Sequence, residues 1–239
     1  MKILFNTEHR LRSGWRILIQ FLGFVILLVI VQNIQDDARE RRDALMFGIG
    51  GCLYLLGGLG MVWGAGRWPD RRKFVDYGFR LNREWWMDMG AGLLIGAFTL
   101  TVVFVVEWMA GWVRIVSFTE TVFDGSFILV GGSILLSLLA VGVTEELVFR
   151  GYQLRNLAEG LRFGKKNGLA VVLAWVGTSV FFGIAHLMNQ DATLFSSMNV
   201  ALAGMLLGWG YVVTGQLALP IGLHIAWGFF EEFVYGFAN

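Results

Sequence analysis

Stretches of about 20 apolar residues recur along the sequence, and each is long enough to cross a bilayer as a helix. Hydrophobic residues make up 56% and charged residues 15% of the 239 positions, whereas about 25% of a soluble domain is charged. We therefore predict an all-α, polytopic membrane helix bundle of about seven to eight transmembrane helices. The predicted spans are residues 15–34, 44–65, 89–110, 127–148, 168–188, 194–213 and 217–237.

Basic residues at the ends of these spans predict the orientation of the chain. Three arginines precede the apolar core of the first span, the segment 67–86 holds six Lys or Arg, and the segment 150–168 is also basic. Such segments stay on the cytoplasmic side, so the N-terminus is expected inside. The short loops favour the cytoplasmic membrane of a bacterium. A net charge of +1 gives no basic field for nucleic acid, so the expected partner is the lipid bilayer with a membrane protein or peptide.

Ionisable side chains at membrane depth are the candidate functional residues, because each costs about 2.5–3.5 kcal/mol on insertion scales. Short loops leave little room for chemistry outside the membrane, so a site must be built from the helices. Small-residue pairs at the spacing of one helical turn, such as Gly92 with Gly96 and Gly204 with Gly208, predict close helix packing and nothing more. The polar candidates in the spans are Glu145, Glu146, Arg150, His186, Asn199, His224, Glu231 and Glu232.

Two adjacent acids and an arginine stand at the end of the fourth predicted span, in the stretch VTEELVFRGY. On a helix, Glu146 and Arg150 are four residues apart and can pair. Glu145 is rotated by about 100° and faces another direction. This spacing predicts one acid held structurally by the arginine and one acid free to react.

Two of the three histidines lie in later spans, His186 after a run of aromatic residues and His224 early in the last span. Taken singly, each has an ordinary interpretation as a core residue bonded to a backbone carbonyl. Together with an acid on a third helix, they can orient and deprotonate a water molecule, with or without a metal. His9 lies in a polar N-terminal segment and is expected to be solvated.

Three motifs in this order resemble the CPBP family of intramembrane proteases, also called the CAAX-protease and bacteriocin-processing, or Abi, family. The stretch EELVFRG fits E-E-x-x-x-R, Phe182 to His186 fits F-x-x-x-H, and His224 opens H-x-x-x-N/D. The resemblance covers about residues 85–235. It implies a domain division into an N-terminal hairpin with a basic loop, 1–84, and a protease core, 85–239.

The resemblance implies an all-helical endopeptidase that hydrolyses peptide bonds of membrane-associated proteins or peptides with an activated water. By this likeness, Glu145 is the general base, His186 its partner, and His224 a donor to the oxyanion. Glu146 and Arg150 support the helix. The cofactor is left open: none, or a single divalent metal such as zinc held by Glu145, His186 and His224.

The third motif departs from the family at Gly228, which stands where an Asn or Asp is expected. Loss of one oxyanion donor typically costs about 10²–10³ in turnover. Asn199 is a possible substitute, or it joins helices through a hydrogen bond. The alternative function is therefore a weakened or inactive protein that binds and regulates another membrane protein. A proton-relaying transporter is a third alternative, although the sequence shows no repeated half.

The predicted span ends raise a geometric conflict. They put Glu145 near the inner surface and His186 near the outer end of its helix, yet the groups must converge within a few ångströms. Either the fourth helix continues through FRGYQLRNLA or the fifth is tilted or displaced.

Overall fold

The computed structural model describes residues 4–6, 10–117, 122–162, 167–189 and 192–237. His9 and part of the basic segment after the fourth helix, residues 163–166, lie outside the described residues. The helices, in chain order, are α1 Ser13–Glu40, α2 Ala44–Ala65, η1 Gly66–Asp70, η2 Phe74–Tyr77, α3 Arg83–Met109, α4 Phe127–Glu146, η3 Leu147–Leu154, α5 Arg155–Gly160, α6 Asn167–Ala185, η4 His186–Met188, α7 Leu194–Thr214, α8 Ala218–Gly228 and η5 Phe229–Val234.

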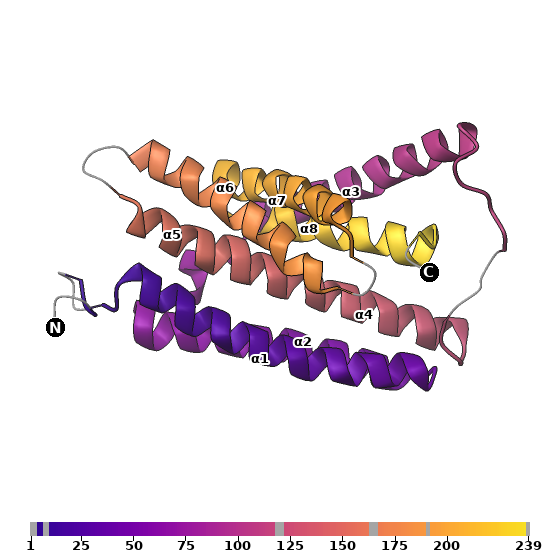
Figure 1. Cartoon of the computed structure of the whole chain (residues 1–239), viewed down its shortest axis with the longest axis horizontal. Coiled ribbons are helices and arrows are strands. Elements are labelled where there is room, and N and C mark those ends of the chain that lie inside the picture. The colour runs from indigo at the N-terminus through magenta and orange to yellow at the C-terminus, as the bar shows by residue number, and fades with distance from the viewer. Residues whose placement is uncertain (1–3, 7–9, 118–121, 163–166, 190–191, 238–239) are drawn as a thin grey trace.

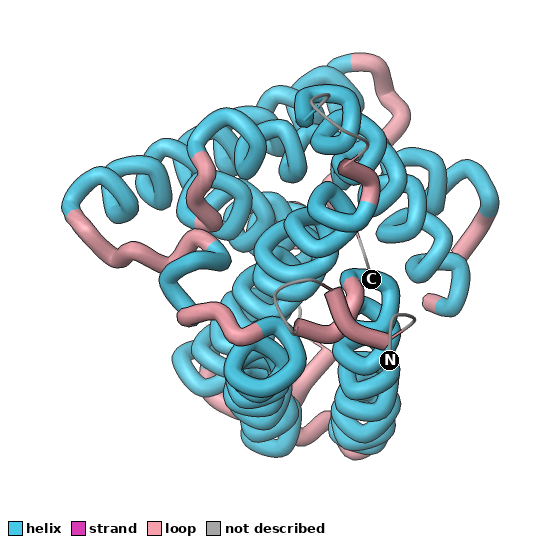
Figure 2. Tube along the Cα trace, turned by 90° about the vertical axis from the view of Figure 1, so that its left-hand side faces the viewer, coloured by secondary structure: helices cyan, strands magenta, loops and turns pink. Residues whose placement is uncertain are grey.

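The long helices run side by side, and loops join them at the two ends of the bundle (Figures 1 and 2). Within the described residues, six helices are long and apolar enough to cross a membrane. The seventh predicted span, 217–237, is the shorter helix α8 continued by the π-helical turns of η5. The prediction of an all-α polytopic bundle is confirmed.

The end of the fourth predicted span is wrong. The helix does not stop at residue 148 but continues through η3 and α5 as one rod, Phe127–Gly160. η3 is a π-helix, a widened turn that is frequent at functional sites. Hydropathy marks the edge of an apolar run, whereas a helix ends only where its backbone hydrogen bonds end. The segment 150–168 is therefore helical over its first eleven residues rather than a loop.

Two other predicted spans were too short at one end. α1 runs to Glu40, six residues past the predicted end, and α3 begins at Arg83, six residues before the predicted start. The Asn82 side chain caps α3, because its oxygen accepts a hydrogen bond from the Trp85 backbone nitrogen at 2.9 Å. Polar residues thus extend these helices beyond their apolar segments.

Small residues bring neighbouring helices into direct backbone contact, as the glycine spacing predicts. A Cβ added to Gly51 of α2 would lie 2.7 Å from the Ser137 hydroxyl of α4. A Cβ added to Gly96 of α3 would lie 2.8 Å from the Leu223 carbonyl oxygen of α8. These contacts fix where α2 lies along the axis of α4 and where α8 lies along the axis of α3.

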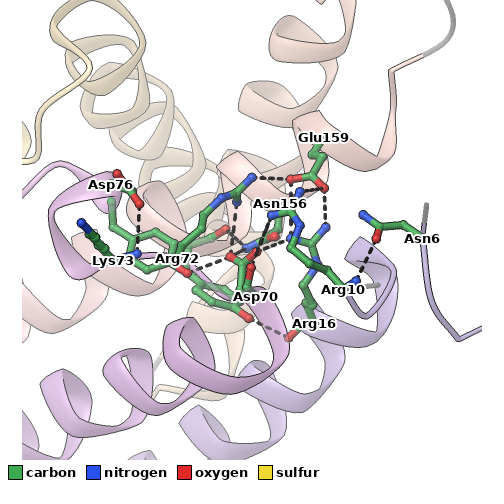
Figure 3. Close-up of polar contacts among 11 residues, drawn as sticks. Asn6, Arg10, Arg16, Asp70, Arg72, Lys73, Asp76, Asn156 and Glu159 are labelled. Carbon is green, nitrogen blue, oxygen red and sulfur yellow. Dashed lines mark hydrogen bonds and ion pairs between the residues drawn. The ribbon is translucent and has the colours of Figure 1, made fainter. Parts of the chain in front are cut away.

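A buried cluster of charges joins the N-terminal hairpin, formed by α1 and α2, to the far end of the α4–α5 rod (Figure 3). Its centre is Asp70 at the end of η1, which is fully buried. The Asp70 carboxylate accepts hydrogen bonds from Arg10, Arg16, Arg72, Tyr77 and Asn156. The three arginines also bond Glu159 of α5. Burial and the neighbouring Asp70 carboxylate raise the pKa of Tyr77, so its hydroxyl stays a donor.

This Asp70 cluster explains why the polar end of the rod remains folded against the bundle. Buried charges are tolerated only when each is paired and hydrogen-bonded. Asn156 donates to the Asp70 carboxylate, and the partly buried Glu159 pairs with Arg16 of α1 and with Arg72 of the segment after η1. The hairpin thus packs tightly on the rest of the chain, and the division at residues 84 and 85 stays a prediction.

We predict that Asp70→Asn lowers the free energy of unfolding by roughly 3–5 kcal/mol, because it removes the buried carboxylate that pairs with the fully buried Arg16. The measurement is thermal or denaturant unfolding of the purified protein in detergent. The matched control is Asp36→Asn, which breaks an ion pair with Arg39 whose side chains are 67% and 50% exposed. That control should change stability by less than about 1 kcal/mol. Equal effects of the two variants would contradict the assignment.

Candidate active site

The buried carboxylate of Glu146 is the centre of the polar groups in the middle of the bundle. It lies at the last position of α4, directly before the widened turn of η3, and is fully buried. Its Oε1 atom is 2.8 Å from Arg150 Nη1 and 2.8 Å from His224 Nδ1. One oxygen therefore accepts from a side chain of its own helix and from one on α8.

Arg150 connects this carboxylate to α6 and α7. Its Nη2 donates to the Gly204 carbonyl oxygen of α7 at 3.1 Å, and its guanidinium lies 4.4 Å from the ring centre of Phe182 on α6. A Cβ added to Gly204 would lie 3.2 Å from Phe182 and 3.3 Å from Arg150 Nη2. Glycine at position 204 thus leaves the space that the guanidinium occupies.

Glu145 faces a different direction from Glu146, as the helical spacing predicts. Its side chain is 13% exposed, and its Oε2 atom is 4.0 Å from His224 Nε2. In the described part of the chain, this buried oxygen has no hydrogen-bond partner. The carboxylate is therefore positioned to accept a hydrogen bond from water or from a bound molecule.

His224 lies between the two acids, a contact that the spacing of the sequence does not reveal. Its Nδ1 is bonded to Glu146 and its Nε2 faces Glu145. Because a carboxylate only accepts, Nδ1 carries a proton and Nε2 is the nitrogen available for chemistry. Glu146 therefore orients this ring in addition to pairing with Arg150.

His186 approaches from the end of α6, on the aromatic side of the site. Its ring centre is 4.5 Å from that of Phe182, which lies 6.3 Å from that of His224. The Nδ1 atom of His186 is 2.8 Å from the Phe182 carbonyl oxygen, so Nε2 is left for other partners. The two histidines thus contact the same buried phenylalanine.

The extension of the fourth helix resolves the conflict over the height of His186. α6 runs antiparallel to the rod: Gly177 lies near Leu157, and the Phe182 ring packs on Phe149 with centres 5.0 Å apart. The rod continues past residue 148 to Gly160, which adds about 20 Å of helix. α6 therefore begins about 20 Å further from the motif acids than it would beside a helix that ended at residue 148. The end of α6 therefore reaches only as far as the motif acids.

Two positions were considered for an amide donor to the oxyanion, residue 228 and Asn199. Gly228 lies one turn after His224 on α8, and a Cβ there would be 3.0 Å from Leu138 Cδ2, so an apolar side chain fills this space. Asn199 is exposed on α7, and no hydrogen bond joins it to another described residue. The interpretation of Asn199 as a link between helices is therefore wrong, because its side chain points away from them.

Within the described residues, no group of three or more His, Cys, Asp or Glu side chains is arranged to hold a metal ion. Glu145 Oε2 and His224 Nε2 lie 4.0 Å apart, and the His186 ring packs against Phe182. Glu231 and Glu232 lie in η5, after Gly228 on the same helix. The zinc site considered from the sequence stays a hypothesis.

We predict that Glu146→Gln lowers stability by about 3 kcal/mol or more, because Arg150 then lies buried without a counter-charge. The neighbouring Glu145→Gln is the matched control. It removes the same charge from a side chain that makes no hydrogen bond to the described residues, so its stability should stay within about 1 kcal/mol of the parent. Thermal unfolding in detergent measures both, and equal losses would contradict the division of roles.

Comparison with known proteins gives one match. Residues 128–230 fit the family model described as type II CAAX prenyl endopeptidase Rce1-like. This segment includes the motif acids, both histidines and Gly228. Neither the curated proteins nor the solved structures contain a match to the chain. The matched segment carries all three motifs, and its similarity is to the CAAX-protease family that those motifs resemble.

Proposed function

We propose that this protein is an intramembrane endopeptidase that hydrolyses peptide bonds of membrane-associated proteins or peptides. The observation that carries the proposal is the pair formed by Glu145 and His224. Glu145 has a buried oxygen without a partner, and it faces the free nitrogen of a histidine that Glu146 orients. Similarity to an endopeptidase family supports the same reaction class.

In the proposed reaction, Glu145 removes a proton from a water molecule while the water oxygen attacks the scissile carbonyl carbon. The carbonyl π bond breaks, and its electron pair moves to the oxygen. The tetrahedral intermediate then collapses, the C–N bond breaks, and protonated Glu145 gives its proton to the leaving amine. Each proton and electron pair is thereby accounted for without a further reactant.

His224 is the proposed electrostatic partner of the oxyanion. The Glu146 carboxylate, 2.8 Å from Nδ1, stabilises an imidazolium, whose Nε2–H would donate to the developing negative charge. His186, with Nδ1 held by the Phe182 carbonyl, is the proposed second contact for the water or the substrate. The alternative considered from the sequence, a zinc ion that Glu145 and the histidines would hold, is tested by metal analysis of the purified protein.

The proposed substrates reach the site from the membrane. Glu145 and His224 lie among helices long and apolar enough to span a bilayer, and both are only partly exposed. A substrate must therefore bring an extended backbone segment into the bundle. We further propose a bacterial cytoplasmic membrane with the N-terminus inside, on the basis of the basic segments.

A second candidate function is a non-catalytic protein that binds and regulates another membrane protein. Gly228 favours it, because Leu138 occupies the space where the family places an amide or carboxyl side chain. The presence of Glu145, Glu146, Arg150, His186 and His224 together favours the enzyme. Binding alone does not require a carboxylate oxygen held without a partner beside a histidine.

We predict that Glu145→Gln abolishes hydrolysis while the amount of folded protein stays unchanged. An amide cannot accept the proton of the water, so the chemical step is lost. The measurement uses liposomes that contain the protein and one of two probes: a quenched fluorescent peptide ending in a prenylated CAAX motif, or a quenched fluorescent transmembrane peptide. A Glu145→Gln variant that cleaves either probe at the parent rate would remove Glu145 as the base. A parent that cleaves neither would favour the binding protein.

We also predict that Gly228→Asn raises kcat by about tenfold or more, which is a part of the roughly 10²–10³ that a single well-placed oxyanion donor contributes. The new Cβ meets only the flexible end of Leu138, so a rotation of that side chain can admit it. Gly228→Ala is the matched control, because it adds the same Cβ without an amide. A folded Gly228→Asn protein no faster than Gly228→Ala would mean that another group already supplies the donor.

A further inference from the structure

A groove lies at the end of the bundle that carries the Asp70 cluster, far from the Glu145–His224 pair. The chain before α1 forms one side of it, because residues 4–6 run antiparallel to residues 10–12. The groove has a volume of about 320 Å³, and ligand sites in proteins typically measure about 300–1,000 Å³. The described residues that line it are Phe5, Leu11, Ile19, Trp68, Pro69 and Arg71. All of them except Arg71 are apolar, so the groove is an apolar surface with a single cation.

The Asp70 cluster holds the two sides of this groove together (Figure 3). Asp70 stands between the lining residues Pro69 and Arg71 in the sequence. Its carboxylate accepts a hydrogen bond from Arg10 of the N-terminal segment at 3.3 Å, and it also pairs with Arg16 of α1. The N-terminal segment, α1 and the end of η1 are therefore joined by ion pairs directly behind the groove.

Arg71 occupies a backbone position that favours glycine. Its φ of 53° and ψ of 43° place it in the left-handed region at the end of η1, where a side chain costs free energy and glycine does not. The side chain is exposed, and no hydrogen bond or ion pair joins it to another described residue. It adds nothing to the Asp70 cluster beside it. A cation in an unfavourable backbone position, free of partners and facing an apolar groove, indicates a ligand with a negative group.

Tryptophans place the groove at the depth of lipid headgroups. Trp15 near the start of α1, Trp63 near the end of α2 and Trp68 in η1 are 41%, 54% and 68% exposed, and the rings of Trp63 and Trp68 are in contact, with centres 5.7 Å apart. Exposed indole rings at the ends of spans prefer the membrane interface. A molecule at that depth that carries both an apolar chain and a phosphate is a phospholipid, and a guanidinium matches phosphate in geometry and charge.

The charge around the groove favours a headgroup with a net negative charge. The described lining residues include no acid. Arg67 and Lys73, on either side of Arg71 in the sequence, are also exposed cations. Basic residues at a membrane surface attract anionic lipids, whereas a zwitterionic headgroup would bring a second cation next to these side chains.

We propose that this groove binds one anionic phospholipid, with its phosphate on Arg71 and its apolar part along Phe5, Ile19 and Trp68. The lipid would bridge the N-terminal segment and the end of η1, the two elements that the Asp70 cluster joins from behind. The site does not depend on the proposed function, because no residue of the Glu145–His224 pair takes part in it.

The test is native mass spectrometry of the full chain in detergent with an equal mixture of phosphatidylglycerol and phosphatidylcholine of the same acyl chains. We expect one retained lipid, with phosphatidylglycerol preferred by at least about fivefold, the scale of one basic side chain near an anionic headgroup. Arg71→Gly should abolish this preference. Glycine suits the left-handed backbone, so we expect the variant to fold and its melting temperature without lipid not to fall.

The matched control is Arg42→Gly at the other end of α1. Arg42 also has a left-handed backbone, with a φ of 56°, and its exposed side chain pairs with Asp124. The substitution removes the same charge and relieves the same backbone strain, so the preference for phosphatidylglycerol should stay. As a second readout, phosphatidylglycerol should raise the melting temperature of the parent and of Arg42→Gly more than that of Arg71→Gly.

Four results would overturn the proposal. Equal retention of the two lipids would remove the role of charge, and a preference that persists in Arg71→Gly would place the lipid elsewhere. Glycerol 3-phosphate, which has the phosphate without acyl chains, should not bind at lipid concentrations; if it binds as strongly as phosphatidylglycerol, the ligand is a free anion. A parent that retains neither lipid would leave the groove to a segment of another membrane protein.

Discussion

The buried negative charge of Glu146 holds together the helices from which the site is built. A carboxylate in this position is tolerated only if it is paired, and its two partners come from different parts of the chain. Arg150 bonds the Gly204 carbonyl of α7 and contacts the Phe182 ring of α6. His224, the other partner of Glu146, belongs to α8. Without this charge, α6, α7 and α8 would lose their common polar contact, and His224 would lose the group that orients its ring.

A second set of buried contacts aligns the N-terminal hairpin with the same rod. Small residues fix α2 against α4 along its length, and the Asp70 cluster fixes the end of η1 against α5. The rod Phe127–Gly160 is therefore held at its middle by the Glu146 contacts and at its far end by Asp70. This arrangement places the Tyr54 carbonyl of the hairpin against the Thr144 hydroxyl, one residue before Glu145.

The errors in the predicted spans have one physical cause. Hydropathy measures which residues prefer hydrocarbon, but a helix continues through polar residues when other helices neutralise them. Asn156 is buried and Glu159 is partly buried, and their partners Asp70 and Arg16 lie far away in the sequence. The shortened fourth span followed from this, and so did the conflict over the height of His186. Asn199 shows the reverse case, since a polar residue within a span need not face the interior.

The amino-acid sequence alone determined the membrane class, the helical bundle and the resemblance to the CAAX-protease family, because repeated apolar stretches and ordered motifs are local patterns. The separate directions of Glu145 and Glu146 also followed from helix geometry. Only the tertiary structure decided that Glu146 bonds His224 as well as Arg150 and that Leu138 fills the space beside Gly228. These contacts join residues on different helices. Their geometry depends on how closely the backbones of two helices approach at small residues. Residue spacing within one helix does not give that distance.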